Sequence, residues 1–221
     1  MINTMKKALL VVILTVFTAN IASAQEADEF RENWQQTITV PDSEASTIEK
    51  LFEAWGKVFP GKYVDAFHKF KETGNADKIE FLWGLENDFK VELAPKNGFL
   101  EIDGTYVLHL PEDNQGQMSG DVTKTHILTA VIWNLQNGNK LFAVSINDDG
   151  EVFAECAIAF YEYDAKKGTL TPRIQTTQKV LDIINDTEIF VRLPKEGRDL
   201  HYIDYGDYGK QKTIKWNGNG F

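Results

Sequence analysis

The chain has 221 residues, of which 43% are apolar, 25% charged and 12% aromatic. This composition is typical of a globular protein, and it excludes wholesale disorder, a collagen-like repeat and a polytopic membrane protein. The formal charge of −10 argues against nucleic-acid binding, because phosphate recognition needs a basic surface.

The first 24 residues have the three regions of a secretory signal peptide. Lys6 and Lys7 are basic, Ala8–Ala19 is an apolar run, and Ala22–Ala24 is a small-x-small cleavage site before Gln25. The apolar run is too short to span a bilayer as a helix. We therefore expect cleavage near Gln25, a mature chain that does not span the membrane, and a location in the bacterial periplasm or outside the cell.

The mature chain is large enough to fold without disulfide bonds or a structural metal ion. Removing 24 residues from 221 leaves 197, and the loss of two lysines changes the charge from −10 to −12. A chain of this size buries about 70% of its unfolded surface. Its single cysteine, Cys156, forms no intramolecular disulfide, and we expect it to be a small core residue. No cofactor is expected.

Residues 25–45 are expected to form a polar N-terminal arm, solvated at its acidic start, and residues 46–221 a single α+β domain with helices within 46–74. The first helix begins at Ser46, which forms a capping box with Glu49, and it ends at Pro60-Gly61. A second helix is expected over residues 62–72. The apolar stripe of the first helix comprises Ile48, Leu51, Phe52, Trp55, Val58 and Phe59.

Residues 88–221 show strand-like alternation with short connections, which predicts a large antiparallel meander. Pro95–Gly98 and Asn137-Gly138 predict hairpins, Asn147–Gly150 a tight turn, residues 110–124 a loop, and residues 177–184 a short helix. Residues 127–134 are apolar on both faces, which predicts a central strand covered on both sides. The sheet could be open, a sandwich or a barrel. The expected strands are 89–93, 99–102 with 106–110, 127–135, 140–146, 152–163, 169–173, 188–193, 200–205 and 212–216.

Motifs for catalysis and metal binding are absent from the sequence, so no catalytic residue is assigned. The four histidines follow no signature, and there is no G-x-S-x-G, C-x-x-C or H-E-x-x-H motif. Asp148 and Asp149 lie in an oxygen-rich segment and are weak calcium candidates. The same residues are common in β-turns, so a turn without a metal is the favoured explanation.

Tyrosine residues are the candidate binding groups. Tyrosine combines an apolar ring with a polar hydroxyl, so an exposed row of tyrosines could bind a glycan or a protein. The alternative is a structural role at the rim of the core or in cross-strand pairs. The candidates are Tyr161 and Tyr163 on one strand face, and Tyr202, Tyr205 and Tyr208 near the last hairpin.

Two stretches resemble uncharacterised small secreted proteins of Gram-negative bacteria. Residues 212–221 are similar to their terminal strand, and residues 161–164 followed by 168–170 are similar to their hairpins. The resemblance implies secretion and a β-rich body. The leading hypothesis is an exported, non-enzymatic binding protein for a protein, glycan or small molecule. A hydrolase with no recognisable motif and a structural or assembly component are the alternatives.

Overall fold

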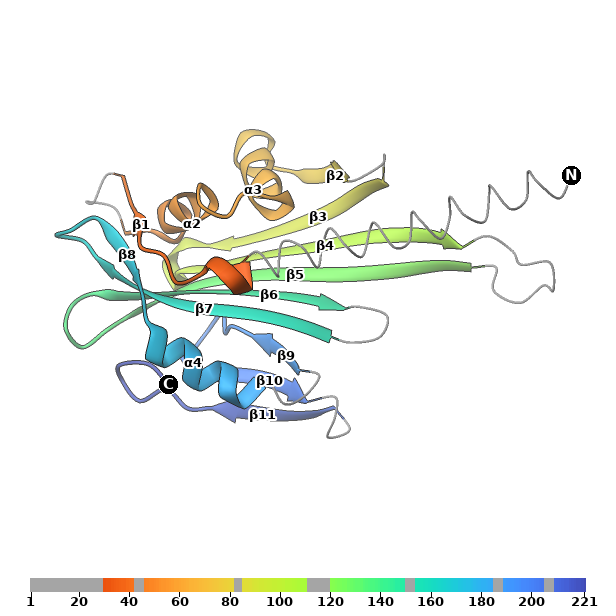
Figure 1. Ribbon diagram of the computed structural model, residues 1–221. Coiled ribbons are helices and arrows are strands. Elements are labelled where there is room, and N and C mark those ends of the chain that lie inside the picture. The colour runs from red at the N-terminus through yellow and green to blue at the C-terminus, as the bar shows by residue number, and fades with distance from the viewer. Residues whose placement is uncertain are drawn as a thin grey trace, which may run out of the picture.

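The structure is a computed structural model that describes residues 30–41, 46–81, 85–110, 120–149, 154–184, 189–204 and 209–221. The predicted signal peptide lies outside these residues. The described chain is α+β, with an antiparallel eight-stranded sheet and a second sheet of three strands (Figure 1). The large sheet has the order β1-β8-β7-β6-β5-β4-β3-β2, and it is open because β1 and β2 lie at opposite edges. The predicted fold class is confirmed.

The eleven strands of the described residues pair mainly with their neighbours in sequence, as expected for a meander. The small sheet has the order β11-β10-β9. The strands of the large sheet are β1 (Ile38–Thr39), β2 (Ala76–Phe81), β3 (Leu85–Ala94), β4 (Phe99–Leu110), β5 (Gly120–Asn134), β6 (Lys140–Asp149), β7 (Ala154–Asp164) and β8 (Thr169–Pro172). Those of the small sheet are β9 (Ile189–Arg192), β10 (Leu200–Asp204) and β11 (Lys210–Ile214).

Two helices, α2 (Ile48–Gly56) and α3 (Lys62–Thr73), cover one face of the large sheet (Figure 1). The cap of α2 is Thr47, whose Oγ1 accepts a hydrogen bond from the Lys50 amide at 3.4 Å. This corrects the predicted cap at Ser46 by one residue, because the extended backbone of Thr47 brings its hydroxyl to the third amide of the helix. Helix α3 ends at Gly74, whose φ of 77° is the left-handed geometry that glycine adopts without strain.

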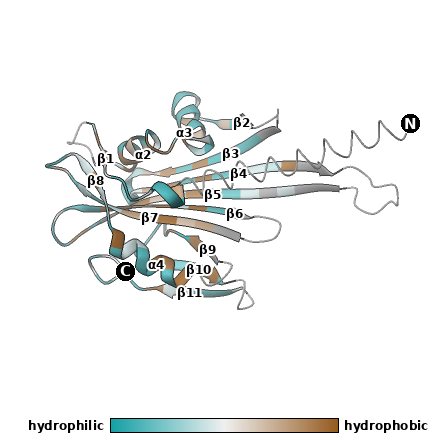
Figure 2. Ribbon diagram, in the orientation of Figure 1, coloured by the Kyte–Doolittle hydropathy of each residue, from teal (hydrophilic) through white to brown (hydrophobic). Residues whose placement is uncertain are grey.

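The opposite face of the large sheet is covered by α4 (Ile174–Ile184) and the small sheet (Figure 1). The buried side chain of Asn147 on β6 joins the two sheets. Its Nδ2 donates to the Val191 carbonyl of β9 at 2.8 Å, and its Oδ1 accepts from the Val191 amide at 3.0 Å. Figure 2 shows apolar residues along β7 and β9, where the two layers meet.

Buried apolar residues form two clusters, one on each face of the large sheet. Leu128 and Ala130 of β5 belong to the cluster under α2 and α3, whereas Val131 and Trp133 belong to the cluster under the small sheet. The prediction that residues 127–134 form a central strand with both faces covered is therefore confirmed. Trp55 and Trp133 are buried, as their apolar stripes predicted.

The prediction that the N-terminal arm is solvated at its start is wrong from Phe30 onward. From Phe30 onward the chain packs into the core beneath the helices, where Phe30, Trp34, Ile38 and Val40 are buried. The ring of Phe30 meets that of Trp55 edge-on, with 5.4 Å between centroids. The charged residues around Phe30 set the average polarity of the segment, but its few apolar side chains decide its position.

Several strands also differ from expectation. β2 was not predicted, because a bulge at Lys78, with a φ of 56°, interrupts the alternation. β5 begins at Gly120, inside the segment expected to be a loop, because it continues to pair with β4 as far as Leu110. β6 extends to Asp149, so Asn147 and Asp148 belong to a strand rather than to a tight turn.

Candidate functional site

Of the five candidate tyrosines, the three that the structure describes do not form an exposed row. Tyr161 and Tyr163 are 0% and 1% exposed and lie under α2, and the Tyr161 hydroxyl donates to the Trp34 carbonyl at 2.9 Å. Tyr202 is partly buried against the second core. Tyr205 and Tyr208 lie outside the described residues. For Tyr161 and Tyr163 the structure therefore fits the alternative of a structural role, because β7 is an interior strand with both faces covered.

Cys156 is partly buried against the second cluster, as the alternation of its strand predicted. Burial raises the pKa of its thiol to about 12, so the group resists ionisation at neutral pH. The backbones of Asp148 and Asp149 lie in β6, and their side chains lie outside the described part of the structure. Within that described part, no group of three or more His, Cys, Asp or Glu residues could hold a metal ion.

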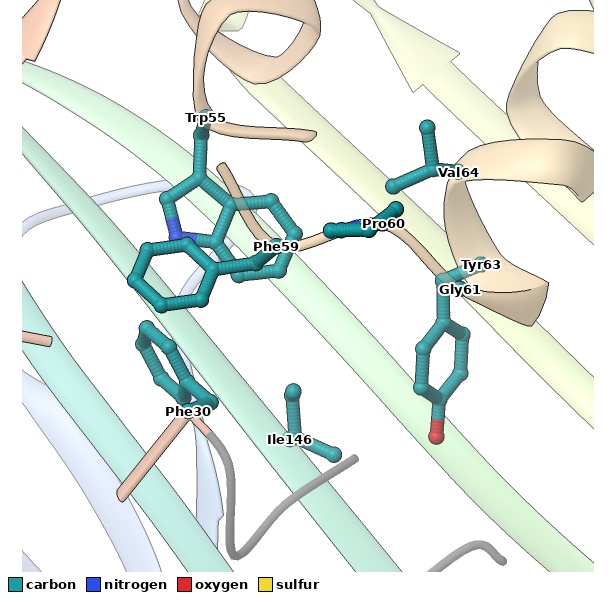
Figure 3. A pocket seen from close by; sticks show the side chains of 8 residues that line it. All are labelled: Phe30, Trp55, Phe59, Pro60, Gly61, Tyr63, Val64 and Ile146. Carbon is teal, nitrogen blue, oxygen red and sulfur yellow. The ribbon is translucent and has the colours of Figure 1, made fainter. Parts of the chain in front are cut away.

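The first concave feature is an aromatic cleft between the helices and the large sheet (Figure 3). Phe30, Trp55 and Phe59 gather on one side, and Tyr63 and Ile146 face them across the gap. The cleft has a volume of about 20 Å³, which is room for about one water molecule. It is therefore a seam in a filled aromatic core and not a pocket for a ligand.

His126 lies beside this seam on β5. Its Nδ1 lies 3.1 Å from the Tyr63 hydroxyl, and the rings of Phe89 and Tyr106 pack around it. The opposing residue on β4 is Gly104, and a Cβ there would overlap the imidazole. The glycine therefore makes room for the histidine.

Burial holds the pKa of His126 well below its ordinary value of 6.5, and the nearby positive charge of Lys62 adds to this effect. The imidazole is therefore neutral at physiological pH. Its surroundings are mainly aromatic, and its exposed fraction is 1%. We interpret His126 as a structural group of the helix-covered core.

A larger groove lies on the opposite face of the large sheet, where β3 and β4 meet the outer side of the small sheet. Its volume is about 290 Å³, near the lower end of the range for small-molecule pockets. Its polar lining consists of Glu92 and Glu101 from the large sheet, Arg192 and Lys195 from β9 and the segment after it, and His201 and Gln211 from β10 and β11.

Opposite charges face each other across the groove. Lys195 forms an ion pair with Glu92, and Arg192 Nη2 lies 3.5 Å from Glu101 Oε1. The acids are on the large sheet and the bases on the small-sheet side, so each pair crosses the gap. The Arg192 side chain is 60% exposed. Such pairs contribute at most about 1 kcal/mol, so a charged ligand can exchange with them at little cost.

A buried polar row continues from Glu101 along the same face of the large sheet. In the strand register Glu101 lies opposite Thr129, and Thr129 lies opposite Ser145. Both hydroxyl residues are fully buried, and their oxygens have no hydrogen-bond partner within the protein. An unsatisfied buried hydroxyl is costly, so this row favours polar atoms beside it over an apolar filling.

Asp103 lies two residues after Glu101 on β4, on the same face of the strand, and extends this polar patch. Burial raises the pKa of its carboxyl, and the positive charges of Lys90 and Arg192 oppose that rise. Its Oδ1 is buried and accepts no hydrogen bond from the protein. The face of β3 and β4 that borders the groove is therefore strongly polar.

Several contacts fix the small-sheet wall of the groove. The indole Nε1 of Trp133 donates to the Gly197 carbonyl at 3.3 Å, which ties the segment after β9 to the large sheet. Asp199 accepts from the Trp216 amide at 2.9 Å and pairs with Lys215 at 2.7 Å. Nδ1 of His201 lies 3.2 Å from Thr213 Oγ1, which leaves Nε2 as the nitrogen available to a ligand.

Sequence reasoning missed this groove. The available signal was the polar face of the predicted hairpin at residues 89–102, where Lys90, Glu92, Glu101 and Asp103 alternate with apolar residues. That pattern is also typical of a sheet face open to water. The opposing Arg192 and Lys195 come from a distant part of the chain, and no local pattern links them to the hairpin.

Comparison with known proteins does not identify a relative. No family model matches the chain, and neither a curated protein nor a solved structure is detectably similar to it. Of the helices that the structure describes, none is both long enough and apolar enough to cross a bilayer.

Proposed function

We propose that this chain is an exported, non-enzymatic binding protein of the bacterial envelope or exterior, and that it holds a small polar ligand in the groove between its two sheets. The observation that carries the proposal is the mixed-charge lining of a groove of about 290 Å³. Small-molecule sites combine a concave shape with a few polar groups that fix the ligand's orientation. The aromatic cleft offers far less room.

The construction of the groove supports this role. All of its polar side chains except Lys195 come from strands of two sheets that are joined by the Asn147 hydrogen bonds, so these walls are held at a defined separation. Sites on regular elements hold their groups more precisely than sites on loops. The hydroxyls of Thr129 and Ser145, which have no hydrogen-bond partner within the protein, extend the polar strip from Glu101 toward the middle of the sheet and do not line the groove.

Export is the second part of the proposal, and it rests on the signal-peptide features of residues 1–24. Recovery of the protein from the fractionated source cell tests it. We expect the protein in the periplasmic or extracellular fraction, and N-terminal sequencing should begin at Gln25. Recovery of an uncleaved chain from the cytoplasm would contradict export and leave the groove to be tested separately.

The binding experiment screens a library of small polar molecules against the purified protein by NMR. We expect a ligand to shift the side-chain amide signals of Gln211 and the ring signals of His201, which both line the groove. Shifts confined to residues on the helix-covered face, such as Tyr63, would contradict this location of the site. The ligand is then recovered after prolonged incubation, and we expect it unchanged.

The alternatives give different results in the same set of measurements. Conversion of the ligand would favour the hydrolase. Concentration-dependent self-association, with no ligand found, would favour an assembly component whose edge strands pair with neighbours. A protein partner of the acidic chain would appear in a pull-down at low salt and be lost at high salt, because salt screens surface charges.

A further inference from the structure

We propose that the groove ligand is a small zwitterion, a molecule carrying both an ammonium and a carboxylate group, of which free amino acids and dipeptides are the simplest examples. This inference rests on the proposed function, because it names the class of ligand for the same groove. It is drawn from the arrangement of charges on the two walls of the groove.

The walls carry opposite and equal charge. Glu92 and Glu101 extend from the large sheet, and Arg192 and Lys195 extend from the small-sheet side. Each acid is paired with a base across the gap. A ligand that enters the groove must separate these ion pairs. The separated side chains are stabilised only if the ligand provides a cation for the acids and an anion for the bases.

A zwitterion meets this requirement, whereas a singly charged ion does not. Its ammonium group donates to the Glu92 and Glu101 carboxylates, and its carboxylate accepts from the Arg192 guanidinium, which matches carboxylate geometry with paired donors. A simple carboxylate would satisfy the bases and leave the acids without partners. An amine would do the reverse. Charge neutrality is kept only when both groups arrive together.

Size and polarity restrict the zwitterion further. The groove has room for about ten water molecules, taking about 30 Å³ for each, so an amino acid or dipeptide fits and a long peptide does not. Phe99, Leu193 and Pro194 supply an apolar part of the lining. A side chain or the Cα of the ligand lies against these groups, while its charged ends lie against the acidic and basic walls.

The test is an NMR titration of the purified protein with matched probes that differ in charge. Glycylglycine carries both charges, N-acetylglycine only the carboxylate, and glycinamide only the ammonium, while glycine distinguishes a free amino acid from a dipeptide. We expect a zwitterion to shift the Gln211 and His201 signals and to bind about 10-fold more tightly than either singly charged probe, because each lost partner removes a charge-assisted hydrogen bond.

Two variants assign the charges to the walls. Glu101→Gln should weaken the dipeptide and glycinamide about 10-fold and should not weaken N-acetylglycine, because a carboxylate no longer has to displace this acid from Arg192. Arg192→Gln should weaken the dipeptide and N-acetylglycine and should not weaken glycinamide, because Glu101 is then free of its ion pair. The matched control is Glu53→Gln, which removes the Lys71 ion pair on the helix-covered face, and it should leave all affinities unchanged. Unfolding midpoints close to that of the wild type show that the variants are folded.

The outcomes separate this inference from the proposed function. Equal binding of all charged probes, or groove shifts caused only by library compounds that are not zwitterions, would overturn the zwitterion and leave the binding protein intact. No groove shift with any probe or library compound would overturn both. A charge preference that Glu101→Gln and Arg192→Gln fail to move would also overturn the inference.

Discussion

The two faces of the large sheet are covered in different ways. On the helix-covered face, aromatic side chains from α2, α3 and the N-terminal segment leave a cleft of only about 20 Å³. On the other face the small sheet leaves a groove of about 290 Å³ lined by charged groups. The same strands contribute to both faces, so the difference arises from the side chains that each strand directs to each side.

The geometry of the covering layers explains the difference. Helix α2 contacts β1, β4 and β5, and helix α3 contacts β2, β3 and β4. Large aromatic rings fill the space beneath the two helices. In the small sheet, β9 contacts β6 and β7. Beyond this contact, β3 and β4 carry charged residues on the same face of the large sheet, and Glu92 and Glu101 line the groove there. One face is thus filled by aromatic packing, whereas the other combines an apolar cluster with a polar recess at its edge.

The largest expected effect is on the helix-covered face. Trp55→Ala should lower the free energy of unfolding by about 3–5 kcal/mol, because a buried indole that packs on Phe30, Phe52 and Phe59 is replaced by a cavity. Denaturant unfolding measures the loss. Trp216→Ala, at a half-buried indole on the opposite face, should cost less. Equal losses would contradict the difference between the faces.

The junction between the sheets should be the next most sensitive place. Asn147→Ala leaves the buried amide and carbonyl of Val191 without partners, and it should cost about 2–3 kcal/mol. Asn147→Asp keeps an acceptor but loses the donor, so it should not restore stability. The control Gln178→Ala removes an exposed amide that donates to Asp182 and should cost less than about 0.5 kcal/mol.

Crowding at His126 gives a smaller and more specific effect. Gly104→Ala places a Cβ against the imidazole and should destabilise by about 1–3 kcal/mol. In a His126→Ala background the same substitution should cost almost nothing, because the ring that it meets is gone. An unchanged cost in that background would show that backbone conformation at Gly104 is responsible.

The smallest effect concerns pH. The pKa of His126 is held well below 6.5 by burial, so below pH 6.5 the unfolded chain binds a proton that the folded chain does not. The stabilisation that comes from keeping His126 neutral is therefore fully present above pH 6.5. It is lost as the pH falls toward the pKa of the folded state, by up to about 1.4 kcal/mol per pH unit. Unfolding curves between pH 5 and 7 should show this slope in the wild type and a reduced slope in His126→Gln.

Much of the fold could be predicted because local signals encode it. The stripe at Ile48, Leu51 and Trp55 predicted a helix with one buried face, and Asn137-Gly138 predicted the β5–β6 hairpin. Antiparallel pairing followed from the short connections between strands. These signals depend on residues a few positions apart, which periodicity and turn chemistry describe directly.

The candidate site could not be predicted in this way. Tyr161 was a candidate for an exposed tyrosine row because it shares a strand face with Tyr163, and only the tertiary structure shows that this face belongs to the core cluster beneath the helices. Glu101 and Arg192 are unremarkable charges in sequence and become one groove because the small sheet folds back beside β4. Which charges meet depends on how two sheets pack together.

The amino-acid sequence by itself determined the α+β class, the antiparallel order of most strands and the two-sided burial of β5, because each follows from hydrophobic periodicity and turn residues within short segments. Tertiary structure alone decided that the segment from Phe30 belongs to the core, that the tyrosine face of β7 is buried and that a charged groove exists. Those properties arise where side chains from distant segments compete for the same space, and no local pattern records the result.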